Sequence, residues 1–100
     1  MPTEGMKYDD DKLDWTLLPI EEVEDVIRAL MHGAKKYEAF NWQKVDKDRY
    51  VKAAFRHLTQ YQKGELLDIG ENGSGLPHLA HAICSLLFVM WHDQNDEKEL

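Results

Sequence analysis

The chain has 100 residues, enough for one small domain and little else. Hydrophobic residues make up 43% and aromatic residues 10%, a composition that excludes a disordered chain. The formal net charge of −7 argues against a nucleic-acid backbone as the main partner, because duplex binding depends on cations that neutralise phosphates. Small phosphorylated ligands stay possible, since a few lysines around a metal are enough to hold them.

The sequence also predicts a cytoplasmic protein that does not cross a membrane. The N-terminus is polar and acidic, so no signal peptide is expected. The longest apolar stretch, residues 79–91, is too short to span a bilayer. The one cysteine, Cys84, is expected to be a small core residue, because it lies within that apolar stretch. A single cysteine cannot form a disulfide within the chain.

The first predicted elements are an extended arm and one helix. The arm covers residues 1–19 and carries apolar anchors between Leu13 and Leu18. The helix, residues 20–37, follows Pro19 and has acidic residues in its first turn and lysines in its last, as the helix dipole favours. Its apolar stripe repeats at intervals of three and four and consists of Val23, Ile27, Leu30, Met31 and Ala34.

Two more helices are expected, at residues 48–68 and 76–92. Asp46 or Asp48 can cap the first, and Pro77 suits the first turn of the second. Between them lies a loop with three glycines in residues 70–75, and residues 94–100 form an acidic tail. No segment alternates with period two for long, so the sequence predicts an all-α domain. A chain this short buries only about two-thirds of its unfolded surface, so we expect a homo-oligomer to complete the core.

The second half of the chain carries candidate metal ligands. Glu65 and Asp68 are three residues apart, and Glu71 follows three residues later. If the helix continued past Gly64, Glu65 and Asp68 would share one face with His57. Carboxylates presented together suit Mg²⁺ (or Mn²⁺), which commonly connects them to substrate phosphates. The alternative is a solvated, acidic helix end.

Two histidines, His78 and His81, open the last predicted helix. They share one side with Ser85 and His92, opposite a dense apolar side. This histidine side faces either water or a polar site. Its position at a helix N-terminus after a glycine-rich loop suits an anion such as phosphate. A zinc site is less convincing, because no cysteine ligand has an obvious place.

Other residues have weaker signals. Helix 20–37 carries two acidic pairs with a spacing of three residues, Glu21 with Glu24 and Glu22 with Asp25. Either pair could form a second metal-binding pair, although the helix dipole alone favours acidic residues at this end. A nucleotide can use cations for its phosphates and rings for its base. The candidates for this role are Lys12, Lys35, Lys36, Tyr37, Trp42 and Arg56. Helix capping and a packed tryptophan are the alternative.

Two further arrangements do not lead to a site. The doublet His92-Asp93 is typical of HD-type phosphohydrolases, but such a site needs a late aspartate on a further helix. Neither Ser74 nor Cys84 has an evident base and orienting group, as a nucleophile requires.

The ordered motifs resemble one family. They are Asp11-Lys12-Leu13-Asp14-Trp15, Gly33-Ala34-Lys35-Lys36-Tyr37, Asn41-Trp42, Arg56-His57-Leu58, Gly64-Glu65-Leu66-Leu67-Asp68 and Ser74-Gly75-Leu76-Pro77-His78-Leu79-Ala80-His81-Ala82. Over roughly residues 7–93 the chain resembles the phage-encoded dATP/dGTP diphosphohydrolase N-terminal domain, a group placed near the all-α MazG-like pyrophosphohydrolases.

The resemblance implies a helical, oligomeric, magnesium-dependent enzyme that cleaves a purine deoxynucleoside triphosphate to the monophosphate and pyrophosphate. It implies that Glu65 and Asp68 are a metal-binding pair and that lysines of the arm and of the end of helix 20–37 hold phosphates. Together with the histidine pattern, this predicts catalytic roles for His57, Glu65, Asp68, His78 and His81. MazG-like enzymes, however, pair a Glu-Glu-x-x-Glu motif with a nearby Glu-x-x-Asp motif, and no such first motif precedes Glu65 closely.

Two hypotheses therefore stay open. In the first, histidines complete the metal shell of a pyrophosphohydrolase active in phage nucleotide metabolism. In the second, the protein binds and sequesters a nucleotide or a nucleotide-derived defence signal without turning it over.

Overall fold

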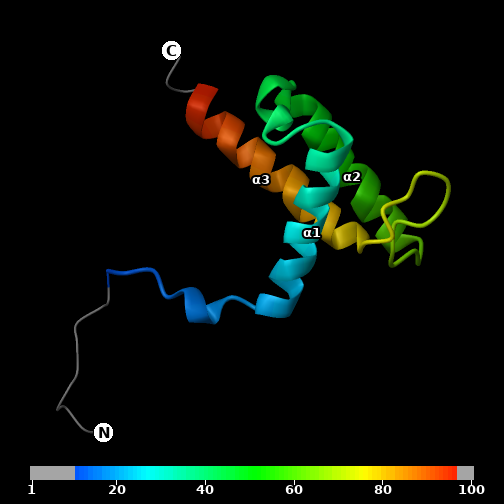
Figure 1. Ribbon diagram of the computed structural model, residues 1–100, viewed down its shortest axis with the longest axis horizontal. Coiled ribbons are helices and arrows are strands. Elements are labelled where there is room, and N and C mark those ends of the chain that lie inside the picture. The colour runs from blue at the N-terminus through cyan, green and yellow to red at the C-terminus, as the bar shows by residue number, and fades with distance from the viewer. Residues whose placement is uncertain (1–10, 97–100) are drawn as a thin grey trace, which may run out of the picture.

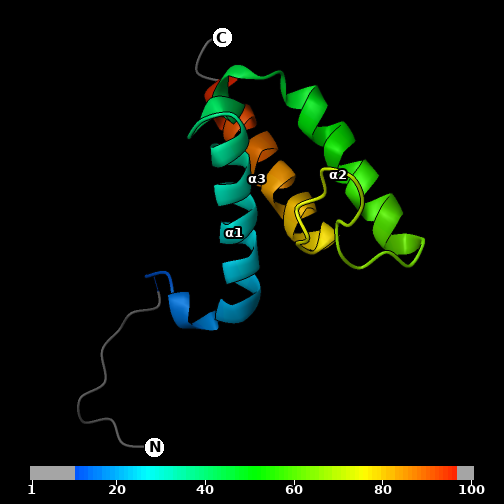
Figure 2. The same ribbon diagram turned by 45° about the vertical axis from the view of Figure 1, so that its right-hand side comes forward.

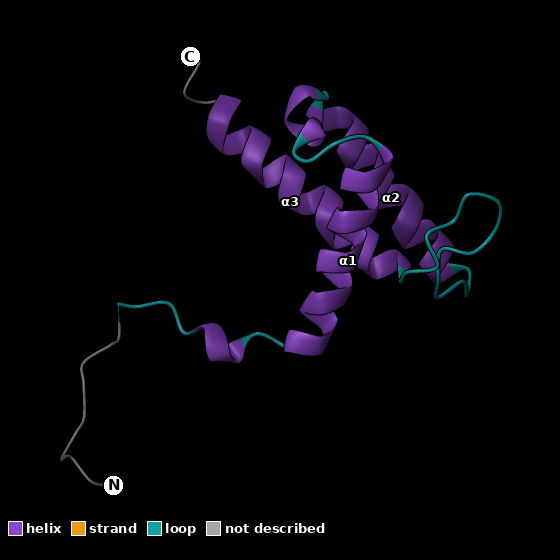
Figure 3. Cartoon of the chain, viewed as in Figure 1, coloured by secondary structure: helices purple, strands orange, loops and turns teal. Residues whose placement is uncertain are grey.

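The computed structural model of the protein describes residues 11–96 and contains three α-helices and two short 3₁₀ helices (Figure 3). The elements in chain order are η1 (Trp15–Leu17), α1 (Ile20–Lys36), η2 (Asn41–Lys44), α2 (Lys47–Gln62) and α3 (His78–Asp96). Within residues 11–96 there is no strand, only an isolated bridge between Leu67 and Pro77. The all-α prediction is confirmed. Residues 1–10 of the predicted arm and 97–100 of the predicted tail lie outside the described residues.

The first helix begins and ends almost where the sequence predicts. Ile20 follows Pro19, whose extended backbone suits the position before a helix. Acidic residues occupy the first turn and lysines the last, in agreement with the helix dipole. The arm before α1 points away from α2 and α3, and all of residues 11–20 are exposed (Figure 1).

The second helix ends earlier than predicted. Asp46 caps its N-terminus, since the Asp46 carboxylate accepts a hydrogen bond from the Asp48 amide at 3.4 Å. The helix stops at Gln62 rather than at residue 68. Gly64 takes a φ of +103°, a conformation that turns the chain out of the helix and that side chains disfavour. Glu65 and Asp68 therefore lie in a loop, and their convergence needs another explanation than a shared helix face.

The third helix packs against both of the others, and α1 and α2 spread apart on either side of it (Figure 2). The core between α1 and α3 consists of small side chains: Val26, Ala29, Ala80 and Cys84. The histidine side of α3 points inward, because His78, Ser85 and His92 are all buried. Its apolar side is at the surface; Leu79, Ile83, Leu86, Leu87 and Met90 are each 36% to 56% exposed.

An aromatic cluster fixes η2 to the middle of α3. The Trp42 ring stacks on Phe88 with centroids 4.6 Å apart, and Tyr50 of α2 meets Phe88 edge-on. The His92 ring, through Nε2, hydrogen bonds to the Trp42 carbonyl oxygen at 3.0 Å. One face of Trp42 is thus used in packing.

Among residues 11–96, none of the helices has the length and apolar character needed to cross a membrane.

Candidate metal and nucleotide site

The loop between α2 and α3 folds back on itself and carries the predicted carboxylates to the start of α3. The Asp68 amide donates to the Leu76 carbonyl at 2.8 Å, and the His78 amide donates to the Leu66 carbonyl at 3.0 Å. The Gly75 amide in turn donates to the Asp68 carbonyl at 2.8 Å. These three bonds hold the two ends of the loop side by side.

Gly73 allows this close folding. A Cβ at position 73 would collide with the backbone carbonyl oxygen of Asp68. Any other residue would push the loop open at the point where Asp68 is held.

Three predicted residues converge at this place. Glu65, Asp68 and His78 each offer one ligand atom, and these atoms lie within 4.8 Å of one another. His78 is 3% exposed, and its Nε2 atom is 2.7 Å from a carboxylate oxygen of Glu65. Two carboxylates and one imidazole form a donor set that fits a divalent metal ion.

Two further predicted histidines adjoin this group. The Nδ1 atoms of His57 and His78 are 2.9 Å apart, a hydrogen bond in which one ring must donate and the other accept. The rings of His57 and His81 are stacked, with centroids 4.8 Å apart and planes within 14°. All five predicted catalytic residues therefore lie in one cluster, contributed by α2, the loop and α3.

Ser74 connects the loop to His81. Its hydroxyl is 2.6 Å from His81 Nε2 and 3.4 Å from Asp68 Oδ2, and it accepts a hydrogen bond from the Leu76 amide. No base beside Ser74 was evident from the sequence, and the structure places His81 there. Asp68 lies at the same ring nitrogen of His81 as the serine, and among residues 11–96 no carboxylate pairs with the other ring nitrogen, as a nucleophile's base requires. Ser74 orders the loop instead.

Burial keeps His57 and His81 uncharged. Burial lowers the pKa of His57 to about 4, electrostatic repulsion between a proton on His57 and one on His81 or His78 lowers it further, and Asp68 opposes both effects. Burial likewise lowers the pKa of His81, with Asp68 opposing it. Near neutral pH both rings are therefore neutral and hold one lone pair each, which a metal or a proton donor can use.

Three residues of the cluster, His57, Asp68 and His81, also line a cavity of about 660 Å³, to which α1, η2, α2, α3 and the loop contribute. Such a volume suits a nucleotide-sized ligand. Near the cluster its lining includes His57, Asp68 and His81, and two turns further along α3 it includes Phe88 beside Trp42. A polar end and an aromatic end are thus joined in one cavity.

Some of the predicted nucleotide-binding residues line this cavity. Lys36, Tyr37 and Trp42 do so, and the Lys36 ammonium lies 5.4 Å from the centre of the Tyr37 ring. Lys35 and Arg56 are exposed and are not among the lining residues, nor is Lys12 in the arm.

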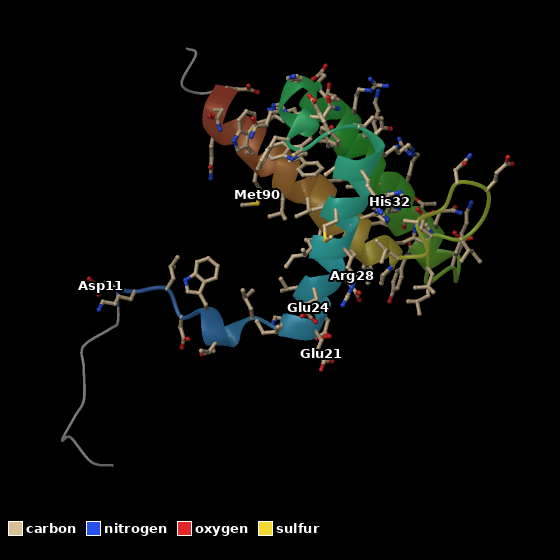
Figure 4. The ribbon with its side chains drawn as sticks, in the orientation of Figure 1. Asp11, Glu21, Glu24, Arg28, His32 and Met90 are labelled. Atoms are coloured by element: carbon tan, nitrogen blue, oxygen red, sulfur yellow. The ribbon has the colours of Figure 1, made fainter. Side chains whose placement is uncertain are left out.

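The remaining predicted acids lie away from the cluster. Glu71 is exposed in the loop and does not belong to the three-residue group. On α1, Glu21 and Glu24 stand toward the beginning of the helix, and His32 stands nearer its end (Figure 4). Asp25 pairs with Arg28 at 2.9 Å.

His32 was missed by the sequence analysis. It lines the cavity, and its ring meets His81 edge-on with centroids 6.2 Å apart. The sequence contained one signal that could have identified His32. It lies four residues before Lys36, a spacing that places both side chains on one face of α1.

The fold and the site define a class of small all-α proteins in which a carboxylate–histidine cluster, with a donor set that fits a divalent ion, lies beside a cavity of nucleotide size. Comparison with known proteins narrows this class. The family model described as dATP/dGTP diphosphohydrolase, N-terminal, matches residues 2–99, so the chain belongs to that family.

A curated relative extends the comparison. A dATP/dGTP diphosphohydrolase of Salmonella phage PMBT28 is 34% identical over 87 residues, which cover 87% of this chain. The match spans 29% of that relative's length. No solved structure matches the chain.

Proposed function

We propose that the protein is a metal-dependent hydrolase that converts a purine deoxynucleoside triphosphate, dATP or dGTP, to the monophosphate and pyrophosphate. The observation that carries this proposal is the convergence of Glu65, Asp68 and His78 beside a cavity of nucleotide size, whose lining includes Asp68. Carboxylates alone would repel a triphosphate, and a cation between them removes that repulsion. The name of the phage relative supports the same substrate class.

In this proposal Glu65 and Asp68 hold the metal, with Mg²⁺ or Mn²⁺ as the predicted ion. A divalent ion at this centre supplies charge neutralisation for phosphate oxygens and activation of water. Glu71, which the sequence also predicted as a ligand, lies outside the group of three and holds no metal in this proposal.

The cavity residues would hold the nucleotide. Neutral His57 and His81 line the polar end, where they can exchange hydrogen bonds with the phosphates. Lys36 would bind a phosphate by charge, and the rings of Tyr37 and Trp42 would contact the base. We expect Lys12, Lys35 and Arg56 to attract the triphosphate from outside the cavity.

Incubation of the purified protein with each dNTP and Mg²⁺ or Mn²⁺, followed by ion-exchange chromatography, tests the reaction. We expect deoxynucleoside monophosphate and an equimolar amount of pyrophosphate, both absent under EDTA. The double substitution Glu65→Ala and Asp68→Ala should abolish turnover, and Glu71→Gln should retain it. No product from any nucleotide would refute the enzymatic function.

A second candidate function is binding without turnover, with the protein sequestering a nucleotide or a nucleotide-derived signal. The observation in its favour is that only two carboxylates join His78 in the cluster, fewer than paired acidic motifs would supply. Calorimetric titration with cyclic and adenylated nucleotides tests it. Binding that survives Glu65→Ala and Asp68→Ala, together with no turnover, would establish this function.

We also propose that the protein is a homo-oligomer in the cytoplasm of a phage-infected host. The exposed apolar side of α3 supports the first part, and the phage origin of the relative supports the second.

A further inference from the structure

The metal cluster contains an imidazole at its most buried position, which bears on the kind of ion that it selects. His78 is 3% exposed, whereas the side chains of Glu65 and Asp68 are 31% and 28% exposed. Mg²⁺ strongly favours oxygen ligands and keeps several waters, so a buried imidazole adds little to its binding. Imidazole suits Zn²⁺ and other first-row transition ions, which also accept carboxylates.

The orientation of His78 is fixed by its second nitrogen. Its Nδ1 atom hydrogen bonds to His57 Nδ1 at 2.9 Å, and its Nε2 atom faces Glu65 at 2.7 Å. Without an ion, His78 Nε2–H donates to the Glu65 carboxylate; with an ion in place of that proton, Nδ1–H donates to His57 and the Nε2 lone pair binds the ion. Metal-ligating histidines commonly make such a hydrogen bond through the ring nitrogen that does not bind the metal.

The carboxylate of Asp68 is held in a similar way. Its Oδ2 atom accepts from the Ser74 amide and hydroxyl at 3.4 Å, and His81 Nε2 lies 3.8 Å from it. These contacts engage one carboxylate oxygen and leave the other available to an ion. Both the imidazole and this carboxylate thus have the supporting hydrogen bonds that orient metal ligands.

We propose that His78 is a metal ligand oriented by His57, and that the centre it forms with Glu65 and Asp68 binds Zn²⁺, Mn²⁺ or Co²⁺ in preference to Mg²⁺. The inference rests on the proposed function only for the position of the metal. It adds the class of ion, the nitrogen ligand and a positioning role for His57.

Calorimetric titration of the metal-free protein with Zn²⁺, Mn²⁺, Co²⁺ and Mg²⁺, each alone and without nucleotide, tests the selectivity. We expect at least one transition ion to bind about tenfold or more tightly than Mg²⁺. His78→Gln should remove this preference, because the two remaining carboxylates bind all four ions through oxygen. Mg²⁺ binding as tightly as the other ions would overturn the proposal.

Two matched variants separate a lost ligand from a lost fold. His92→Gln replaces another buried histidine of α3 that bonds to Trp42 and not to the cluster. Glu71→Gln replaces an exposed acid of the same loop. Both should keep the metal affinity of the native protein. A loss in either variant equal to that in His78→Gln would contradict the assignment.

The role of His57 has its own measurement. His57→Ala should lower transition-metal affinity about 10- to 100-fold, as loss of such a supporting hydrogen bond does, and His57→Asn, which keeps an acceptor, should restore part of it. Equal affinity in native and His57→Ala proteins would refute the positioning role.

Histidine ¹⁵N NMR of the native protein needs no variant. Addition of Zn²⁺ should shift the Nε2 resonance of His78, with the proton on Nδ1 in the bound state, and unchanged His78 resonances would overturn the proposal. Because these readouts use no substrate, a protein that binds Zn²⁺ but hydrolyses no dNTP would contradict the proposed function alone.

Discussion

His57 lies between two other histidines and a carboxylate, and its protonation should influence stability. The groups that face it are His78 and His81 from α3 and Asp68 from the loop, with Arg56 beside it on α2. The pKa of His57 is lowered from its ordinary value of 6.5 to about 4 in the folded protein. As the pH falls, the unfolded chain therefore binds this proton before the folded protein does. The stability linked to His57 is complete above about pH 6.5 and declines as the pH falls toward 4.

Urea unfolding in the presence of EDTA at pH 7.5, 6 and 4.5 checks this prediction. The native protein should lose more stability over this interval than His57→Gln, whose side chain does not titrate. If the free energy of unfolding falls equally with pH in both proteins, His57 does not contribute to the pH dependence.

Cys84 is expected to be chemically inert in the folded protein. Burial raises the pKa of its thiol to about 11, and the thiol donates a hydrogen bond to the Val26 carbonyl at 3.4 Å. Since the thiolate is the reactive form, iodoacetamide at pH 8 should modify the native protein at least tenfold more slowly than the urea-unfolded chain. Mass spectrometry of the alkylated protein measures both rates, and equal rates would contradict the buried position.

The loop between α2 and α3 is the element that forms the metal cluster. Gly73→Ala should open it, because the added Cβ collides with the carbonyl oxygen of Asp68. We expect a loss of about 1 to 3 kcal/mol in the free energy of unfolding and weaker metal binding. Gly33→Ala provides the control, since the space around Gly33 is open and alanine favours a helix. Equal stability of the two variants would show that the loop tolerates a side chain at position 73.

At the level of elements, the sequence was informative about helices and less so about their ends and faces. Residue patterns and caps predicted α1 to within one residue, because Pro19 and the terminal charges act locally. The end of α2 was missed, because a glycine inside a helical pattern is often tolerated and only the local φ shows that Gly64 ends the helix.

The structure brings together the five residues that the sequence marked as catalytic candidates, but not for the reason that the sequence suggested. Glu65 and Asp68 reach His78 through hydrogen bonds between loop residues far apart in sequence, and residue spacing does not reveal such bonds. The inward side of α3 was likewise open to two interpretations. Partners on α2 and η2, such as His57 and Trp42, decide that its polar side is buried.

Considered as a whole, the described part of the molecule has too little core for its apolar content. No large side chain among residues 11–96 is less than 2% exposed, and the buried hydrophobic residues are mostly alanines. From His78 to His92, α3 carries no charged residue other than histidine, although the chain has a net charge of −7. A charge-free apolar face can pair with its own copy about a two-fold axis without electrostatic repulsion at the contact.

We therefore expect a dimer in which this face of α3 is covered by the same face of a second copy. Light scattering after size exclusion should give about twice the 11.7 kDa of the chain. Ile83→Glu combined with Leu86→Glu should produce monomers, because two carboxylates on each side would meet across an apolar contact of about 800 Å² per subunit. Phe55→Glu places one carboxylate at an exposed position of α2 and should leave the dimer intact. A native protein that elutes as a monomer, or a dimer that persists after both α3 substitutions, would show that another surface or another partner covers these residues.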